Sequence, residues 1–287
     1  MATLREIKGR IVSITSTRKI TSAMKMVSSS KLHKAQVALK NMLPYAQSLH
    51  HIMNRLLANG YAPPGVSEKR TVRRTALVVF SSDSALCGAF NTNIFRELQK
   101  ALAAYRSQHV DVTLYVVGKK AFDFARREGL HVARHYEKLS GATAGEPLAA
   151  LADELTDLFE KQEIDRAELI YHRFKSIGTQ TLTSEPFLPL TPIAADNTAV
   201  STATDYILEP DHKSLMTALV PQMLHLQLYT ALLHSITSEH AVRMIAMQTA
   251  TDNADELIDE LTVAYNKSRQ QAITNELLDI VGGAVNN

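Results

Sequence analysis

The sequence lacks several features that would define large classes of proteins. Cys87 is the single cysteine among 287 residues, so no disulfide can form within the chain and a zinc site built from thiolates is excluded. No apolar run approaches the ~18 residues that a membrane-spanning helix needs. Tryptophan is absent. These absences argue against a disulfide-rich secreted protein or an integral membrane protein, and they favour a reducing, cytoplasmic setting.

A targeting signal is missing from the first residues. MATLREIKGR has no apolar core of the kind that a secretory signal needs. The acidic Glu6 and the helical pattern that runs through it argue against a transit peptide. We therefore expect neither a secretory signal nor a transit peptide at this end.

Motifs for nucleotides, metals and nucleophilic catalysis are also absent. The segment SSDSALCGAFNTN does not fit the dinucleotide fingerprint, and VGKK (117–120) lacks both the first glycine and the terminal hydroxyl of a P-loop. The histidines form no H-E-x-x-H pattern, and no activating base can be assigned to Cys87, which we expect to be a small buried residue. The sequence predicts no cofactor, no metal and no enzymatic activity; a nucleotide-binding α/β protein is the alternative.

Charge is distributed unevenly along the chain. Residues 1–60 carry a net charge of +9, whereas residues 211–287 carry −5. The two ends should attract each other, and the surplus positive charge suits an acidic partner. With no tryptophan, few aromatic residues near the basic side chains and an acidic last segment, the chain is not expected to bind nucleic acid.

The first segment has the pattern of a long coiled-coil helix. Thr3 and Glu6 form a capping box at its start. Apolar residues then follow at alternating spacings of three and four, and the same series becomes polar in the middle before it turns apolar again. Its positions are Leu4, Ile7, Ile11, Ile14, Arg18, Thr21, Lys25, Ser28, Leu32, Ala35, Leu39 and Met42. We expect a kink at Pro44 and the end of the helix at Asn59-Gly60.

The middle of the chain alternates between strands and helices. A buried strand is predicted at 75–82, further strands at 110–118, 166–174 and 179–190, and helices at 90–105, 119–128 and 146–162. Such alternation is typical of a mostly parallel sheet covered by helices, so this part should be a Rossmann-like α/β domain.

The last segment is again a long helix, capped by Asp211. Its coiled-coil series begins at Met244 and continues for about four heptads through Met247, Thr251, Ala254, Ile258, Leu261, Tyr265, Ser268 and Ala272. Pro221 should kink or interrupt this helix, and Gly282-Gly283 should supply a left-handed C-cap. A helix of this length must project from a compact domain.

We therefore predict an N-terminal coiled-coil helix (1–60), a central α/β domain (61–210) and a C-terminal coiled-coil helix (211–287), with the two end helices forming an antiparallel pair. Matching apolar positions predicts the alignment of the pair. The predicted partners are Leu4 with Tyr265, Ile7 with Leu261, Ile11 with Ile258, Ile14 with Ala254, Thr21 with Met247, and Lys25 with Met244 beside Arg243.

Four segments resemble one known family. ITSAMKMVSSSKLHKAQ (20–36), SSDSALCGAFN (81–91), DYILEPD (205–211) and the whole of 238–284 are similar to the gamma subunits of F-type ATP synthases. The likeness covers essentially the whole chain. Ser84, Ala85 and Ala89 stand where the family more often has Arg, Gly and Gly, and the cysteine-bearing insertion of chloroplast gamma subunits is absent.

The resemblance implies the central rotor shaft of a proton-translocating ATP synthase, a non-catalytic subunit that couples rotation of the c-ring to conformational change in the beta subunits. It implies as partners three alpha and three beta subunits, epsilon and the c-ring, on the cytoplasmic face of the bacterial inner membrane. The family's contact positions correspond to Met24, Lys25, Arg243, Arg269, Gln270, Thr274 and Glu276 for the beta subunits, and to Tyr206 and Glu209 for the foot. A static coiled-coil scaffold with the same pattern is the alternative.

Overall fold

The computed structural model describes residues 3–58, 65–68, 70–139, 143–190, 209 and 211–285. Contacts group the chain into two compact units, one made of Met1–Ser30 with Arg243–Asn287 and the other of Lys31–Val242. We call them the coiled-coil unit and the sheet unit. The division of the chain at residues 60 and 210 stays a prediction.

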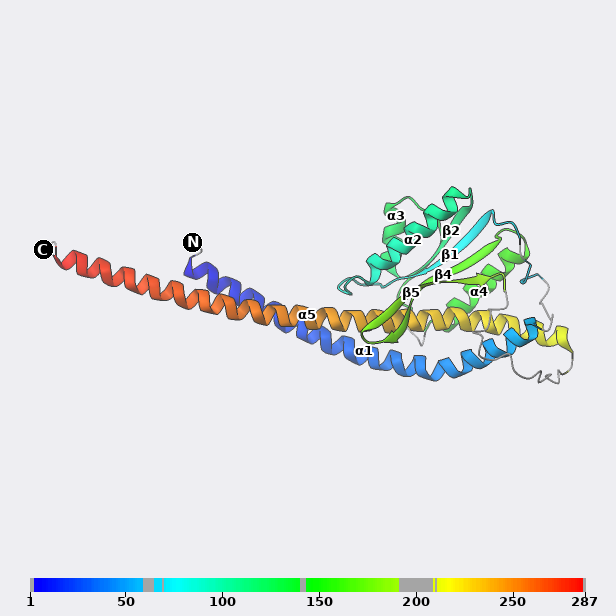
Figure 1. Cartoon of the computed structure of the whole chain (residues 1–287), viewed down its shortest axis with the longest axis horizontal. Helices are drawn as coiled ribbons and strands as arrows, with labels where there is room; N and C mark the ends of the chain where they lie inside the picture. Colours follow the sequence, from blue (N-terminus) through cyan, green and yellow to red (C-terminus); the bar gives the residue numbers. More distant parts are fainter. Residues whose placement is uncertain are drawn as a thin grey trace. The chain divides into compact units, whose positions relative to one another are not determined.

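Both long helices are present (Figure 1), and they begin where the sequence indicates. Helix α1 spans Leu4–Ala58 and helix α5 spans His212–Val285. The capping box is confirmed, because the Thr3 amide donates to Glu6 Oε2 at 2.8 Å and the Glu6 amide donates to Thr3 Oγ1 at 3.3 Å. Asp211 caps α5 through the Ser214 amide at 2.9 Å.

The expected C-cap at the end of α5 is wrong, and of the kink or interruption expected at Pro221 the interruption is absent. The helix is not interrupted at Pro221, which lies in its third turn. It also continues through Gly282 and Gly283, so these residues do not form a C-cap. Glycine is compatible with helical backbone angles and only weakens a helix, by about 1 kcal/mol relative to alanine.

The sheet unit holds five strands in the order β3-β2-β1-β4-β5. The strands are β1 (Arg74–Phe80), β2 (Asp111–Val117), β3 (Val132–Tyr136), β4 (Arg166–Ser176) and β5 (Thr179–Leu188). Strands β1 to β4 are parallel to their neighbours, and only the β4–β5 pair is antiparallel, so the predicted mostly parallel sheet is confirmed. Strand β3 was missed from the sequence, because this short edge strand carries polar and exposed residues.

Each face of the sheet has its own core, as the two-residue period of a strand requires. Val78 and Phe80 of β1 point into a core formed with helix α4 (Gly145–Glu160) and with parts of α1 and α5. Leu77 and Val79 point to the opposite face, which is covered by α2 (Phe90–Ser107) and α3 (Lys119–Arg127). Helices therefore cover both faces of the sheet (Figure 1), and the long helices belong to one of them.

One glycine is required where β2 turns into α3. Gly118 has a φ of +100°, and a Cβ placed there would lie 2.2 Å from the Ser81 carbonyl oxygen. A side chain would therefore force the β1 and β2 ends apart. This residue belongs to the VGKK segment, whose glycine is explained by backbone packing.

Two histidines are buried in the sheet unit, His172 on β4 and His234 on α5. His172 is 4% exposed and stacks on Phe90, with ring centroids 4.4 Å apart. His234 is 8% exposed, and its Nδ1 accepts the Phe174 amide at 3.2 Å. Burial lowers the pKa of His172 to about 4. Burial, with a smaller effect of the Arg173 cation, lowers the pKa of His234 to about 4.

These two side chains should make the fold sensitive to acid. The unfolded chain binds their protons near pH 6.5, whereas the folded chain binds them only near pH 4, so the unfolded state holds more protons between these values. The free energy of unfolding should therefore fall as the pH is lowered from about 6.5 towards 4, by on the order of 3 kcal/mol for each histidine. Urea titrations at a series of pH values measure this.

The test variant is His172→Phe, which keeps an aromatic ring against Phe90. Its matched control is His131→Phe, because the His131 side chain is exposed. His172→Phe should lose less stability than the parent chain over this pH range, and His131→Phe should behave like the parent. Equal losses in all three proteins would show that burial of His172 does not govern the acid response.

Candidate functional site

The coiled-coil unit is the candidate site, because it has a long exposed surface and a polar stretch within an otherwise apolar interface between its helices. Its buried face follows the predicted spacing on both helices. On α5 every position of the predicted series from Met244 to Ala272 is buried or half-buried, while the residues between them are mostly exposed. On α1 the series from Leu4 to Ser28 shows the same pattern. The predicted coiled-coil faces are thus confirmed.

Two polar contacts join the helices inside this unit. The hydroxyl groups of Thr21 and Thr251 share a hydrogen bond of 2.8 Å. Arg18 Nη1 donates to Asp255 Oδ1 at 2.8 Å. The partner number on α5 falls as the number on α1 rises, so the helices run antiparallel, as expected. The basic first segment and the acidic last one do attract each other, through this ion pair.

The alignment of the helices differs from the predicted one. The sequence pairing placed Thr21 opposite Met247, whereas Thr21 bonds Thr251, four residues or one helical turn further along α5. If the same alignment is continued along the two helices, Ile14 lies near Ile258 and Ile11 lies near Leu261. Both alignments pair apolar residues, so apolar matching alone could not distinguish them. The hydroxyl pair and the ion pair favour the observed one.

The two contacts have modest energies. The Arg18–Asp255 pair is on the surface, with side chains 40% and 50% exposed, and such pairs contribute roughly 0–1 kcal/mol. A hydrogen bond between hydroxyl groups contributes about 1 kcal/mol. Each nevertheless has a definite geometry, and a shifted alignment would leave Thr21 facing an apolar side chain. They therefore specify the alignment more than they stabilise the coil.

Three of the predicted contact residues lie near the polar part of the coil. Met24 and Lys25 are half-buried on α1, and the Arg243 side chain is buried, with 7% exposure. The observed alignment brings Lys25 opposite Met247, so its predicted pairing with Met244 is wrong, and it sets Arg243 about one turn further along the coil than Lys25.

Four further predicted residues, Arg269, Gln270, Thr274 and Glu276, are all exposed on the last turns of α5. The Thr274 hydroxyl donates to the Gln270 carbonyl at 2.9 Å, which holds it along the helix. Glu209 is exposed and belongs to the sheet unit. Tyr206 lies outside the described residues.

The outer surface of the coiled-coil unit carries large apolar side chains. On α1 they include Val12, Ile20, Met26 and Val27, and on α5 Leu257, Val263, Ile273, Leu277 and Leu278. Met26 is 74% exposed and Leu278 63%. By the observed alignment, residues beyond about 270 on α5 have no opposite residue on α1, which explains the exposure of the last three. An exposed apolar surface of this extent is typical of a site that another protein covers.

Neither metal ligation nor membrane insertion is supported by the described residues. They hold no group of three or more potential metal ligands, and among them no helix is both long and apolar enough to cross a membrane. The expected burial of Cys87 is confirmed. Its Sγ accepts Asn91 Nδ2 at 3.2 Å, and Asn91 also bonds Ser82, so this thiol helps to hold the β1–α2 connection.

Comparison with known proteins agrees with this picture. The sequence model of the ATP synthase family, described as "ATP synthase", matches residues 3–285. A protein of Bacteroides fragilis named ATP synthase gamma chain is 50% identical over 289 residues, covering 99% of this chain and all of the relative. The ATP synthase gamma chains of Parabacteroides distasonis and Flavobacterium psychrophilum are 48% and 45% identical, each over 99% of this chain. The chain belongs to the gamma chain family of ATP synthases.

Solved structures show the same fold at lower identity. A chain in the Euglena gracilis mitochondrial ATP synthase, solved with OSCP, F1 and c-ring, superposes with a TM-score of 0.68 at 21% identity, covering 98% of this chain and 93% of that one. A chain of the Tetrahymena thermophila central stalk and c-ring gives 0.59 at 24% identity, covering 80% of this chain and 99% of that one. A sheet domain with two long helices is therefore a fold found in this kind of assembly.

The observed alignment can be tested by cross-linking. In a Cys87→Ser background, Thr21→Cys with Thr251→Cys should form a disulfide rapidly, because the two side-chain oxygens lie 2.8 Å apart. Thr21→Cys with Met247→Cys is the matched control and should oxidise more slowly by at least tenfold. The rate is measured from gel mobility under a glutathione redox buffer. Faster cross-linking to position 247 would restore the alignment predicted from the sequence.

Proposed function

We propose that this chain is the central rotor shaft of an F-type ATP synthase, with its coiled-coil unit inside a ring of three alpha and three beta subunits. The observation that carries the proposal is the exposed apolar surface of the coil, in a chain that matches named gamma chains along its whole length. A surface with Met26 and Leu278 in water would favour aggregation. Inside a ring of subunits the same side chains would be covered.

The coil has two regions suited to different tasks. The last turns of α5 expose Ile273, Leu277 and Leu278, and the Thr274 hydroxyl is bonded within its own helix. This end of α5 therefore has a mainly apolar surface. A shaft must avoid deep interlocking with its bearing, since interlocked packing has discrete states that resist sliding. Glu276 is the exposed charge among residues 273–278 and would be one of the few orientation-dependent contacts there.

The polar region around Lys25 and Arg243 is suited to contacts that depend on the orientation of the shaft. Lys25 is half-buried and Arg243 is buried, so both hold their charge in a fixed position on the shaft. As the shaft turns, these cations and Met24 would meet acidic loops of the beta subunits in succession. Arg269 and Gln270 lie on the last turns of α5 and would meet the beta subunits at a second level of the shaft. Contacts that differ among three sites are what shift the sites between conformations. The chain itself would catalyse nothing.

The other partners would bind the sheet unit and the segment before α5. Tyr206 and Glu209 are proposed to face the epsilon subunit and the c-ring. Through these partners the chain would lie at the cytoplasmic face of the bacterial inner membrane as a peripheral subunit. No residue of the chain has to enter the bilayer for this.

The test is co-expression with the alpha and beta subunits of the same organism. The purified complex should contain one copy of this chain for three of each partner, and it should hydrolyse ATP while the isolated chain does not. Failure of the three proteins to co-purify would contradict the proposed role.

Within this complex, Arg243→Ala should leave assembly intact and lower ATP synthesis in membrane vesicles by several-fold, because a cation fixed on the shaft is lost. Arg243→Lys separates charge from packing and should retain more activity. The control is Lys267→Ala, which removes an exposed cation from the same helix and should have little effect. Normal synthesis by Arg243→Ala would remove this residue from the contact set.

A further inference from the structure

A cavity of about 770 Å³ lies within the sheet unit, between α1, the β4–β5 hairpin and α5. Its volume is within the range of ~300–1,000 Å³ that is usual for small-molecule sites. All three elements contribute apolar side chains to its walls, among them Leu43, Ala46, Phe187, Leu190, Met223 and Ala231. All of these residues belong to the sheet unit.

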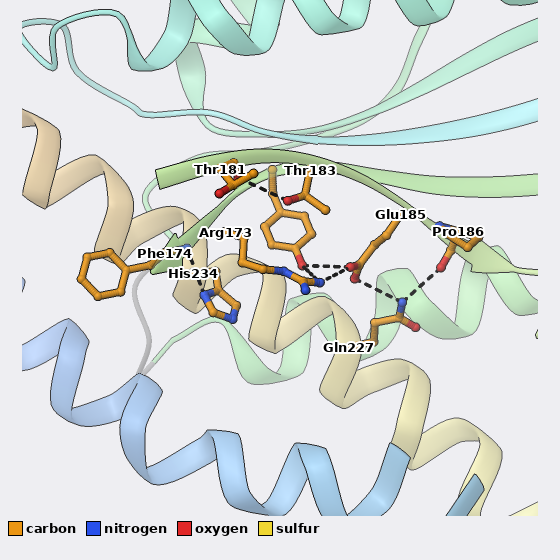
Figure 2. Close-up of polar contacts among 9 residues, drawn as sticks. Arg173, Phe174, Thr181, Thr183, Glu185, Pro186, Gln227 and His234 are labelled. Atoms are coloured by element: carbon orange, nitrogen blue, oxygen red, sulfur yellow. Dashed lines mark hydrogen bonds and ion pairs between the residues drawn. The ribbon is translucent and has the colours of Figure 1, made fainter. Parts of the chain in front are cut away.

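One edge of the cavity is polar and organised around Glu185 (Figure 2). Arg173 Nη2 donates to Glu185 Oε2 at 2.6 Å, and the Tyr171 hydroxyl donates to the same oxygen at 3.0 Å. Gln227 Nε2 donates to Glu185 Oε1 at 3.4 Å and to the Pro186 carbonyl at 3.2 Å. The carboxylate and the guanidinium thus compensate each other, and this edge carries no net charge.

The two histidines of the cavity add no charge near pH 7. His234 accepts the Phe174 amide through Nδ1, so its ring is held as a neutral imidazole (Figure 2). Burial also lowers the pKa of His50, an effect that Glu185 opposes and Arg173 reinforces. Burial and Glu185 raise the pKa of Tyr171, which keeps its phenol protonated. The lining therefore combines neutral hydrogen-bonding groups with apolar walls.

We propose that this cavity binds an uncharged, amphipathic small molecule. Its apolar body would lie against Leu43, Ala46 and Ala231. Its hydrogen-bonding group would meet the neutral His50 ring and the side-chain oxygen of Gln227, whose Nε2 already donates to Glu185 and Pro186. A charged ligand would be disfavoured, because Arg173 and Glu185 already satisfy each other and burying a further charge without a partner is costly. Since α1, α5 and the hairpin all line the cavity, a bound molecule would fasten the three elements to one another.

The test uses the full chain and two dyes, neutral Nile red and the anion 8-anilinonaphthalene-1-sulfonate. Nile red should bind with saturable, blue-shifted fluorescence. Gln47→Trp introduces a large ring at an exposed position of the cavity lining and should weaken this binding at least tenfold. Its matched control is Gln99→Trp at an exposed position of α2, which should bind Nile red as the parent chain does.

A second pair of variants distinguishes loss of the cavity from misfolding and from binding of the dye to the exposed apolar surface of the coiled-coil unit. Ala231→Met fills the cavity from its buried wall, and Ala104→Met adds the same side chain on the surface of α2. Only the first should weaken Nile red binding, and the melting temperature of each variant confirms that it is folded. Equal Nile red affinity in the parent, Gln47→Trp and Ala231→Met would overturn the site. Equally tight binding of the anionic dye, lost in Gln47→Trp, would overturn the assignment of an uncharged ligand.

Discussion

Helix α5 has 74 residues and is therefore about 110 Å long, which sets the main physical constraint on this protein. A helix gains little stability by itself in water, so one stripe of its surface has to be buried along most of that length. Apolar and small residues at alternating spacings of three and four provide the stripe, and α1 covers it in the coiled-coil unit. The occupants include Thr251, Ala254 and Ser268, which bury little apolar area each. The hydrogen bond between Thr21 and Thr251 therefore specifies how the two helices are aligned.

The same two helices have a different role in the sheet unit. There α1 and α5 contribute Leu49, Met53, Leu224 and Leu228 to the core that covers one face of the sheet. Each helix is continuous between the two units. An element that is part of a densely packed core resists displacement, because protein interiors deform little. The sheet unit therefore resists displacement of the segments of α1 and α5 that it contains.

Much of this could be predicted from the sequence, because the signals are local. Spacing identified the buried stripes, and Thr3, Glu6 and Asp211 identified the helix starts. Strand β3 was not found, since an exposed edge strand such as VARHY has no apolar alternation. The helix alignment was wrong by one turn because successive apolar layers are nearly equivalent. The polar edge around Glu185 was also missed, since its members come from β4, β5 and α5 and no local pattern links them.

The central claim is that this chain turns inside a ring of alpha and beta subunits, and single-molecule rotation tests it most directly. Ser107 is exposed at the end of α2 and can be replaced by cysteine in a Cys87→Ser background to carry a bead. With the alpha and beta subunits fixed to a surface, ATP should drive the bead in one direction, with three pauses in each turn, one for each beta subunit. Full ATP hydrolysis with a bead that stays still would contradict the account and identify the chain as a static scaffold.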